Sequence, residues 1–215
     1  MDATPLIAKF LTDDDLKAIG LAVSTAYKAC AEFTRKNFVT GSFPVGVEQR
    51  SHLLRAFADH GLLRLADGRS EFTHEIRPNN ARNCHHVRIY KNGLAMTAHF
   101  MGRNRRRFRH FARSALNREM LAFRNTPDLF GYEQAELDLF KDMGYAQILH
   151  GGGGDIPELL KLVVPTRDQA RIGAHMPLPI PAPDVVAAEL IREEMDIQLK
   201  TRSLDDGADD AEAVG

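Results

Sequence analysis

The chain has 215 residues, of which 44% are hydrophobic and 27% are charged, and its formal net charge is −1. These values are ordinary for a globular protein with a buried core and argue against a disordered chain. No apolar run approaches the roughly 18–20 residues that a membrane span needs, and we expect no membrane association. Two cysteines do not make a disulfide framework, and the N-terminus lacks a basic, apolar leader, so a cytoplasmic location is expected.

The small net charge hides an uneven distribution. Residues 203–215 contain five acids and no base, whereas the preceding residues carry 28 basic against 24 acidic side chains. An acidic disordered tail on a basic body can compete with nucleic acid for a basic surface, or can simply keep a protein soluble.

Two helices are predicted in the N-terminal part, 1–66. Thr12 followed by three aspartates is typical of a helix start, and this helix should run to about Lys36. Its apolar stripe comprises Ile19, Val23, Ala26, Tyr27, Cys30 and Phe33. After the turn-rich residues 41–46, a second helix is expected over 47–60 and ended by Gly61, with Leu53, Leu54 and Phe57 facing inward.

Strands are expected after these helices. Residues 62–66 are compatible with a short strand, and 71–77 alternate between apolar and polar residues up to Pro78. His74 falls on the apolar side and is expected to be a core or edge histidine. The order of helix, helix, strand and hairpin is also that of winged helix-turn-helix domains, in which 47–60 would be the recognition helix and 84–101 the wing.

The dipeptide Asn92-Gly93 predicts a two-residue hairpin turn, because both central residues of a type I′ turn need positive φ. This turn fixes the register, with Lys91 opposite Leu94, Arg88 opposite Thr97, and His86 opposite His99. One face of the hairpin is then apolar and consists of Val87, Ile89, Leu94, Met96, Ala98 and Phe100. The other face is rich in rings and cations and consists of His86, Arg88, Tyr90, Thr97 and His99.

Three interpretations of this polar face remain open. It is either an ordinary solvated or partly covered sheet face, or a binding face on which Tyr90 and the histidines stack on bases and Arg88 meets a phosphate. The third is a metal site formed by Cys84, His86 and His99, since cysteine and histidine suit zinc, although their spacing matches no known zinc motif.

An arginine-rich helix is predicted directly after the hairpin, from Asn104 to about Phe123. Between Gly102 and Asn125 stand eight arginines and a single acid, Glu119. A helix start favours anions, so arginines there repel one another and the helix dipole, and a bound phosphate would relieve both. We expect phosphate contacts from Arg103, Arg105, Arg106, Arg107, Arg109 and Arg113, although pairing with acids elsewhere in the fold is an alternative.

The remaining elements are a helix over 132–143, strands at 145–150 and 159–164, and a glycine loop between them. The loop lacks the Gly-Lys-Ser/Thr of a phosphate-binding loop, and the chain lacks the GxSxG that a hydrolase oxyanion loop needs. A hairpin loop is therefore the preferred interpretation, and no cofactor is predicted. Four prolines make 176–183 a stiff strap, which ends the single domain 1–175.

Asp184 is expected to cap a C-terminal helix over 184–202 that leads into the acidic tail 203–215. Its apolar residues form an approximate stripe, namely Val186, Leu190, Ile191, Met195 and Leu199. A helix on a stiff strap usually packs on its own body, but it can also dock on a second subunit.

Taken together, the sequence predicts an α+β fold with an antiparallel sheet of about five strands and helices on one face. The first functional hypothesis is a cytoplasmic, bacterial-type DNA- or RNA-binding protein that uses the arginine helix and the polar hairpin face. The second is a phosphodiesterase or nucleotide-processing enzyme with His86 and His99 as acid and base. The third is a non-enzymatic interaction module that forms a homo-oligomer through its C-terminal helix.

Overall fold

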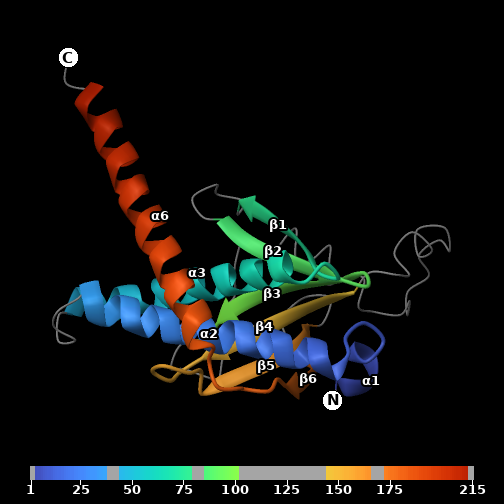
Figure 1. Ribbon diagram of the computed structural model, residues 1–215. Coiled ribbons are helices and arrows are strands. Elements are labelled where there is room, and N and C mark those ends of the chain that lie inside the picture. Colours follow the sequence, from blue (N-terminus) through green and yellow to red (C-terminus); the bar gives the residue numbers. More distant parts are fainter. Residues whose placement is uncertain (1–2, 38–43, 79–84, 102–143, 166–171, 213–215) are drawn as a thin grey trace.

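The structure is a computed structural model that describes residues 3–37, 44–78, 85–101, 144–165 and 172–212. In these residues, helices lie on one face of a six-stranded sheet (Figure 1). The helices are α1 Thr4–Ile7, α2 Asp13–Asn37, α3 Pro44–Gly68 and α6 Val185–Glu212. The strands are β1 Thr73–Pro78, β2 His85–Lys91, β3 Leu94–Phe100, β4 Tyr145–Gly151, β5 Leu159–Pro165 and β6 Ile172–Pro177. The predicted helices over 104–123 and 132–143 lie outside the described residues.

The strands follow one another across the sheet in chain order, from β1 to β6. All neighbours are antiparallel except β3 and β4, which are parallel. The predicted α+β class is confirmed, but the sheet has a sixth strand and is mixed rather than wholly antiparallel. The sixth strand was missed because its first residues lie in a polar stretch that predicts a short helix or a loop, and because Met176 and Pro177 were assigned to the strap. Proline is tolerated at the end of an edge strand, where no ladder hydrogen bond is lost.

The hairpin of β2 and β3 has the predicted register. Asn92 and Gly93 have φ of 49° and 83°, and Lys91 pairs with Leu94 and Arg88 with Thr97. The ladder between β2 and β3 ends at the pair of Arg88 and Thr97, so the predicted pairing of His86 with His99 lies beyond it. The apolar face of the hairpin packs into the core under the helices.

The start of α2 is a reciprocal cap. The Asp15 carboxylate accepts hydrogen bonds from the Thr12 N–H and hydroxyl, both at 2.8 Å, and the Thr12 hydroxyl accepts one from the Asp15 N–H at 3.3 Å. All six residues of the predicted stripe are buried, including Cys30.

The second helix is longer than predicted. Helix α3 runs without a break through Gly61 to Gly68, so the predicted stop at Gly61 and the strand over 62–66 are wrong. A Cβ at Gly61 would lie 2.8 Å from the carbonyl oxygen of Ala22 on α2. This glycine therefore permits close packing of α2 and α3 rather than ending a helix.

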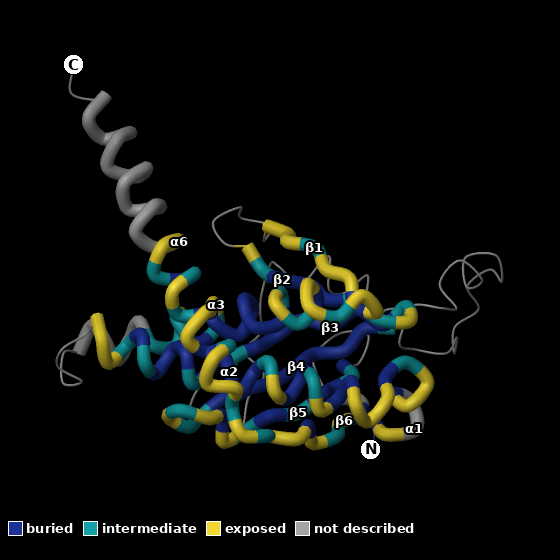
Figure 2. The backbone as a smooth tube through the Cα atoms, in the orientation of Figure 1, coloured by how far each residue is buried: buried dark blue, intermediate teal, exposed yellow. Residues whose placement is uncertain are grey.

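The winged helix interpretation is not supported. Helix α3 packs between α2 and the strands β2 and β3, and these two strands lie in the interior of the sheet. Figure 2 shows the inner strands largely buried. Neither α3 nor the hairpin is therefore a projecting element that could enter a DNA groove.

The strap crosses α2 at Gly20, where a Cβ would lie 2.1 Å from the carbonyl oxygen of Pro179. Asp184 then caps α6, since its carboxylate accepts a hydrogen bond of 3.0 Å from the Ala187 N–H. Helix α6 includes most of the predicted acidic tail and rises away from the body (Figure 1). Among the described residues, no helix combines the length and apolar character needed to cross a membrane.

Candidate functional site

The polar side chains singled out by the sequence share the sheet face that is turned away from the helices. The pleat alternates them with core residues, so Val87 and Ile89 point under the helices while His86, Arg88 and Tyr90 point to the other side. Thr97 and His99 on β3 lie on this same face, because Thr97 pairs with Arg88. We call this surface the polar sheet face.

The polar sheet face is not a solvated surface. The exposed fractions are 6% for Arg88, 1% for Thr97 and 5% for His99. Two polar residues of β4 that the sequence interpretation did not include, Tyr145 and Gln147, are also buried there. Of the first interpretation, a solvated face is therefore wrong for these residues of β2, β3 and β4, whereas a covered sheet face agrees with their burial.

Glu75 of β1 organises one half of this face. Its Oε1 accepts a hydrogen bond of 3.0 Å from Arg88 Nη1 and another from the Tyr90 hydroxyl, and its Oε2 lies 2.9 Å from Arg77 Nη2. Burial acts to raise the pKa of Glu75, but the hydrogen bonds from Tyr90 and Arg77 and the charge of Arg88 outweigh it and lower the pKa. Burial and Glu75 together raise the pKa of Tyr90, which stays neutral.

Among the described residues, basic groups outnumber acidic groups in this cluster. Two guanidinium groups, those of Arg77 and Arg88, share the one carboxylate of Glu75. Arg88 is enclosed, whereas the Arg77 side chain is 54% exposed at the edge of the sheet. The accessible positive charge of the cluster is thus located at Arg77.

A chain of hydroxyl and imidazole groups forms the other half. The Thr97 hydroxyl lies 3.0 Å from His99 Nε2 and 2.7 Å from the Tyr145 hydroxyl. All three side chains are buried. Such a chain fixes the orientation of an imidazole and can pass a proton between hydroxyl groups.

One end of the sheet brings Arg77 and His86 close to the end of β3. Pro78 at the end of β1 pairs with His85, Arg77 pairs with His86, and Phe100 at the end of β3 pairs with His150. The chain therefore enters the arginine-rich segment 103–113 from this end. The predicted phosphate contacts of that segment, Arg103, Arg105, Arg106, Arg107, Arg109 and Arg113, lie outside the described residues, as does Cys84.

The glycine loop begins at the same end of the sheet but is held by the helices. Arg50 Nη2 donates hydrogen bonds to the carbonyl oxygens of Gly153 and Gly154 at 3.0 and 3.3 Å. Asp155 is paired with both Lys28 and Arg35 of α2. The loop thus presents its carbonyl oxygens to a cation, and its position depends on side chains from α2 and α3.

His150, directly before this loop, is a core residue. It is fully buried, and its Nδ1 lies 3.0 Å from the Tyr27 hydroxyl. Burial lowers the pKa of His150 to about 3, so the imidazole is neutral at physiological pH. Within the described part of the chain, no group of three or more histidine, cysteine, aspartate or glutamate residues is arranged to hold a metal ion.

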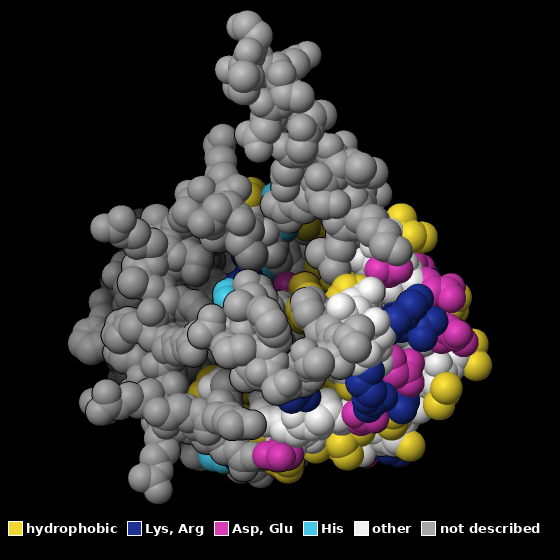
Figure 3. Space-filling model, turned by 90° about the vertical axis from the view of Figure 1, so that its left-hand side faces the viewer, with side chains coloured by type: hydrophobic (Ala, Val, Ile, Leu, Met, Phe, Trp, Pro, Cys, Tyr) yellow, Lys and Arg dark blue, Asp and Glu magenta, His cyan; other side chains and the backbone are white. Residues whose placement is uncertain are grey.

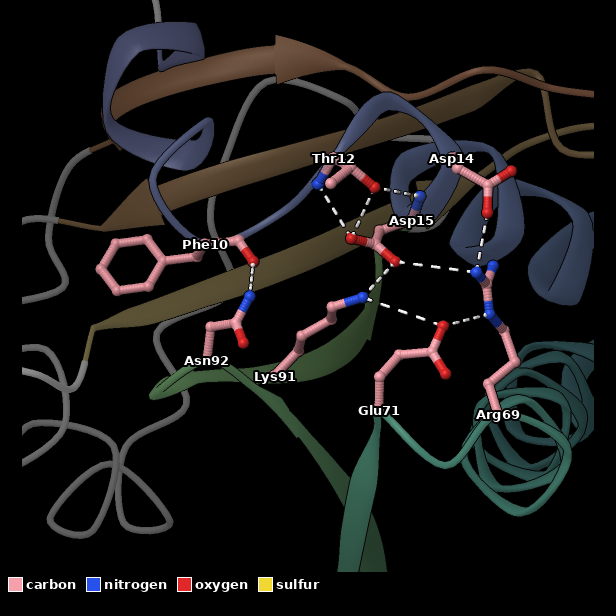
Figure 4. A network of polar contacts seen from close by, with 8 residues as sticks. All are labelled: Phe10, Thr12, Asp14, Asp15, Arg69, Glu71, Lys91 and Asn92. Atoms are coloured by element: carbon pink, nitrogen blue, oxygen red, sulfur yellow. Dashed lines mark hydrogen bonds and ion pairs between the residues drawn. The ribbon is translucent and has the colours of Figure 1, made fainter.

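A second charged network lies at the start of α2 (Figure 4). The Lys91 ammonium is 2.6 Å from the fully buried Asp15 carboxylate, and Arg69 bridges Asp14 and Glu71 at 2.7 and 2.8 Å. Three acids here face two cations, so the network leaves no surplus positive charge. The ion pairs of this network connect the hairpin turn to α2 and α3 and are structural. Elsewhere on the surface, acidic and basic side chains are also interleaved, as the right-hand side of Figure 3 shows.

Comparisons with protein-family models, with curated proteins and with solved structures found no match to this chain.

Proposed function

We propose that the protein binds the phosphate backbone of a nucleic acid at the sheet end where β1 meets β2. The observation that carries the proposal is the sharing of the single Glu75 carboxylate by Arg77 and Arg88, with the Arg77 side chain 54% exposed. A surplus guanidinium at an accessible edge is suited to a phosphate oxygen.

Two further features support this assignment. His85 is exposed beside Pro78 at the same edge, and the chain leaves this end of the sheet for a segment with eight arginines and one acid between 102 and 125. Phosphate contacts of this kind give affinity without sequence information, because they do not read base edges.

In this assignment Arg88 is a positioning residue. It is buried against Glu75 and Tyr90, and it holds the carboxylate to which Arg77 is paired. The direct contacts with phosphate are assigned to Arg77, His85 and the arginine-rich segment 103–113.

The test is fluorescence anisotropy of labelled single- and double-stranded DNA and RNA at several salt concentrations. Arg77→Gln is expected to weaken binding and to reduce the slope of log K against log salt by about 0.7–0.9, the value of one phosphate contact. Lys17→Gln is the matched control, since Lys17 is an exposed cation of α2 on the helical side. A variant with Arg105, Arg106, Arg107 and Arg109 all changed to Glu is expected to lose binding.

The proposal fails if the protein does not bind any of the four probes at low salt. The proposal also fails if Arg77→Gln and Lys17→Gln weaken binding equally, because the effect would then come from net charge and not from a site at Arg77.

Cleavage of a phosphodiester is a second candidate, favoured by the buried chain of His99, Thr97 and Tyr145. His86 and His99 would supply the acid and base, with the arginines stabilising charge on the phosphate. The expected result is that the probe is cleaved with time by the wild type. The variant His99→Gln should still bind the probe but should no longer cleave it. An intact probe after prolonged incubation excludes cleavage and leaves the binding function.

A further inference from the structure

The two edges of the sheet differ in how they are covered. At the β6 edge the chain covers its own strand, because the Ala3 N–H donates to the carbonyl oxygen of His175 at 3.2 Å. At the β1 edge, no described strand lies beside β1 except β2 (Figure 1). Five of the six residues of β1 are exposed, and Figure 2 shows this strand exposed along its length. The β1 edge is therefore open to a further strand.

The direction of the backbone groups in β1 follows from the hairpin beside it. The Ala95 N–H donates to the carbonyl oxygen of Gly144 at 2.9 Å, so the backbone groups of Ala95 face β4 rather than β2. Antiparallel strands alternate between hydrogen-bonded and non-hydrogen-bonded pairs. Tyr90 pairs with Ala95 and therefore directs its backbone groups to β1. Arg88, two residues before Tyr90, does the same and pairs with Glu75.

The outward backbone groups of β1 are therefore those of His74, Ile76 and Pro78. Pro78 fits this alternation, because an edge proline stands where an N–H would face away from the sheet. Among the described residues, the outward N–H and C=O groups of His74 and Ile76 have no strand to pair with. The Ile76 side chain is 56% exposed and lies on the helix-bearing side of the sheet, since Ile76 pairs with Val87 of the core.

We propose that β1 pairs with β1 of a second copy of this chain, antiparallel and around a two-fold axis at Ile76. Ile76 of each copy then donates to and accepts from Ile76 of the other, and the His74 N–H of each copy donates to the carbonyl oxygen of Pro78 of the other. The two sheets become one continuous sheet. Two-fold dimers are the commonest oligomers, and they require a surface that is complementary to itself.

Charge favours this register over the neighbouring one. With the axis at Ile76, Glu75 of each copy stands directly opposite Arg77 of the other on the polar sheet face. With the axis at Glu75, the backbone would form as many hydrogen bonds, but the two Glu75 carboxylates would oppose each other. Opposite charges on facing strands stabilise their pairing, and like charges destabilise it. Glu75 and Arg77 are both located at this edge, where they already form an ion pair of 2.9 Å.

The position of α3 leaves room for the pairing. This helix packs chiefly on β2 and β3, which places it about two strand spacings, or roughly 10 Å, from the proposed axis. The two copies of α3 would then be roughly 20 Å apart, which exceeds the helix diameter of about 10–12 Å.

The dimer goes beyond the proposed phosphate site and does not rest on it. Each copy still contributes the guanidinium groups of Arg77 and Arg88 and the one carboxylate of Glu75, so basic groups outnumber acidic groups in the described cluster of the dimer as well. The interface is small, because each copy contributes one strand of six residues. A small interface is typical of weak association, and we expect the dimer to form reversibly.

The first experiment is sedimentation equilibrium of the full chain over a range of concentrations. The average mass of the wild type is expected to rise from the monomer mass of 24.0 kDa toward twice that value. Ile76→Pro is expected to weaken the association at least tenfold, because the substitution removes the N–H donor of each copy at the axis. The substitution removes no hydrogen bond within the sheet of one copy, so circular dichroism should show that the fold is retained.

Ile76→Thr is the matched control. Threonine is also β-branched, favours strands and keeps the backbone N–H. This variant is expected to weaken the association by roughly fivefold at most, the effect of losing part of one cross-strand contact. A wild-type protein that stays monomeric at every concentration overturns the proposal, and so does an equal effect of the two substitutions.

Cysteine cross-linking tests the register. In the proposed pair the two Cα atoms of residue 76 are about 5.5 Å apart, within disulfide reach, so Ile76→Cys should cross-link to its own copy upon oxidation. The two copies of His74 are roughly 14 Å apart along the strands, so His74→Cys should not cross-link to itself. Peptide mapping separates these cross-links from any that involve native thiols. A failure of Ile76→Cys to cross-link, or efficient cross-linking of His74→Cys to itself, would overturn the proposed register.

Discussion

Two adjacent aspartates at the start of α2 allow a sharp test of the charged network in Figure 4. Asp14 and Asp15 occupy the same helical turn, so their interactions with the helix dipole are similar. Their environments differ, because the Asp15 side chain is fully buried and that of Asp14 is 74% exposed. Replacement of each by asparagine removes one charge from nearly the same place, and at Asp15 it also turns one of the oxygens that accept from Thr12 and Lys91 into a donor.

The magnitudes follow from burial. Removing one partner of a buried ion pair costs about 3–5 kcal/mol, because the other charge stays buried without its partner. For Asp15→Asn we expect a loss of about 3 kcal/mol in the free energy of unfolding, at the low end of that range. Lys91 keeps Glu71 at 3.9 Å and the Phe72 ring, whose centroid is 4.9 Å away. For Asp14→Asn we expect a loss of at most about 1 kcal/mol in the free energy of unfolding, because its pair with Arg69 is exposed.

The assay is equilibrium unfolding in urea, which leaves ionic strength unchanged, first at pH 7 and then in steps down to pH 3. Burial acts to raise the pKa of Asp15, but the hydrogen bonds from Lys91 and Thr12 outweigh it and lower the pKa. A carboxyl group with a lowered folded pKa contributes stability above its unfolded pKa of about 3.9 and loses it as the pH falls through the folded value. The gap between wild type and Asp15→Asn should therefore narrow upon acidification.

Two outcomes would refute this reasoning. Equal losses in the free energy of unfolding for Asp14→Asn and Asp15→Asn at pH 7 would mean that burial does not determine how much an ion pair contributes to stability. A gap that stays constant down to pH 3 would mean that the Asp15 charge is not its source.

The remaining predictions concern the glycine loop and the histidine before it. Gly153→Ala should cost 2 kcal/mol or more, on the order of the strain of a non-glycine residue at positive φ plus a clash, whereas Gly154→Ala should stay within about 0.5 kcal/mol. The reason is that Gly153 has a φ of +72° and a Cβ there would lie 1.9 Å from the carbonyl oxygen of Ile156, whereas nothing lies within 4 Å of a Cβ at Gly154. Urea unfolding of the two variants measures the difference in the free energy of unfolding. Equal losses for the two variants would contradict the prediction. His150→Gln should lower stability at pH 7 but flatten its decline below pH 6. The pKa of His150 is about 3 in the folded protein and about 6.5 in the unfolded chain, so the unfolded chain takes up the proton first. The free energy of unfolding of the wild type therefore falls as the pH falls from about 6.5 to about 3. Parallel pH profiles for wild type and variant would refute this prediction.

The features that the sequence predicted correctly are those fixed by neighbouring residues. Asn92-Gly93 determines a turn geometry, and that turn determines which residues of β2 and β3 share a face. Thr12 and Asp15 form their reciprocal cap within four residues. In both cases the physical constraint is complete within a short segment.

The errors arose where a local signal had a distant cause. Gly61 resembles a helix end, but it accommodates Ala22 of another helix. Pro177 resembles part of a strap, but it ends an edge strand. The parallel pairing of β3 and β4 depends on the path of the chain between them, which no residue within either strand determines.

Burial of the polar sheet face is the least predictable of these features, and the proposed function depends on it more than on the others. Alternation places Arg88 on a polar face but does not say that Glu75, thirteen residues earlier in the chain, will pair with it. Once Glu75 is bound by Arg88 and Tyr90, its other oxygen is left for Arg77 at the sheet edge. The buried arginine thus fixes the carboxylate, and the exposed arginine carries the surplus charge. Under the proposed function, the salt dependence of nucleic-acid binding should therefore fall when Arg77 is replaced, because Arg77 and not the buried Arg88 is expected to contact phosphate.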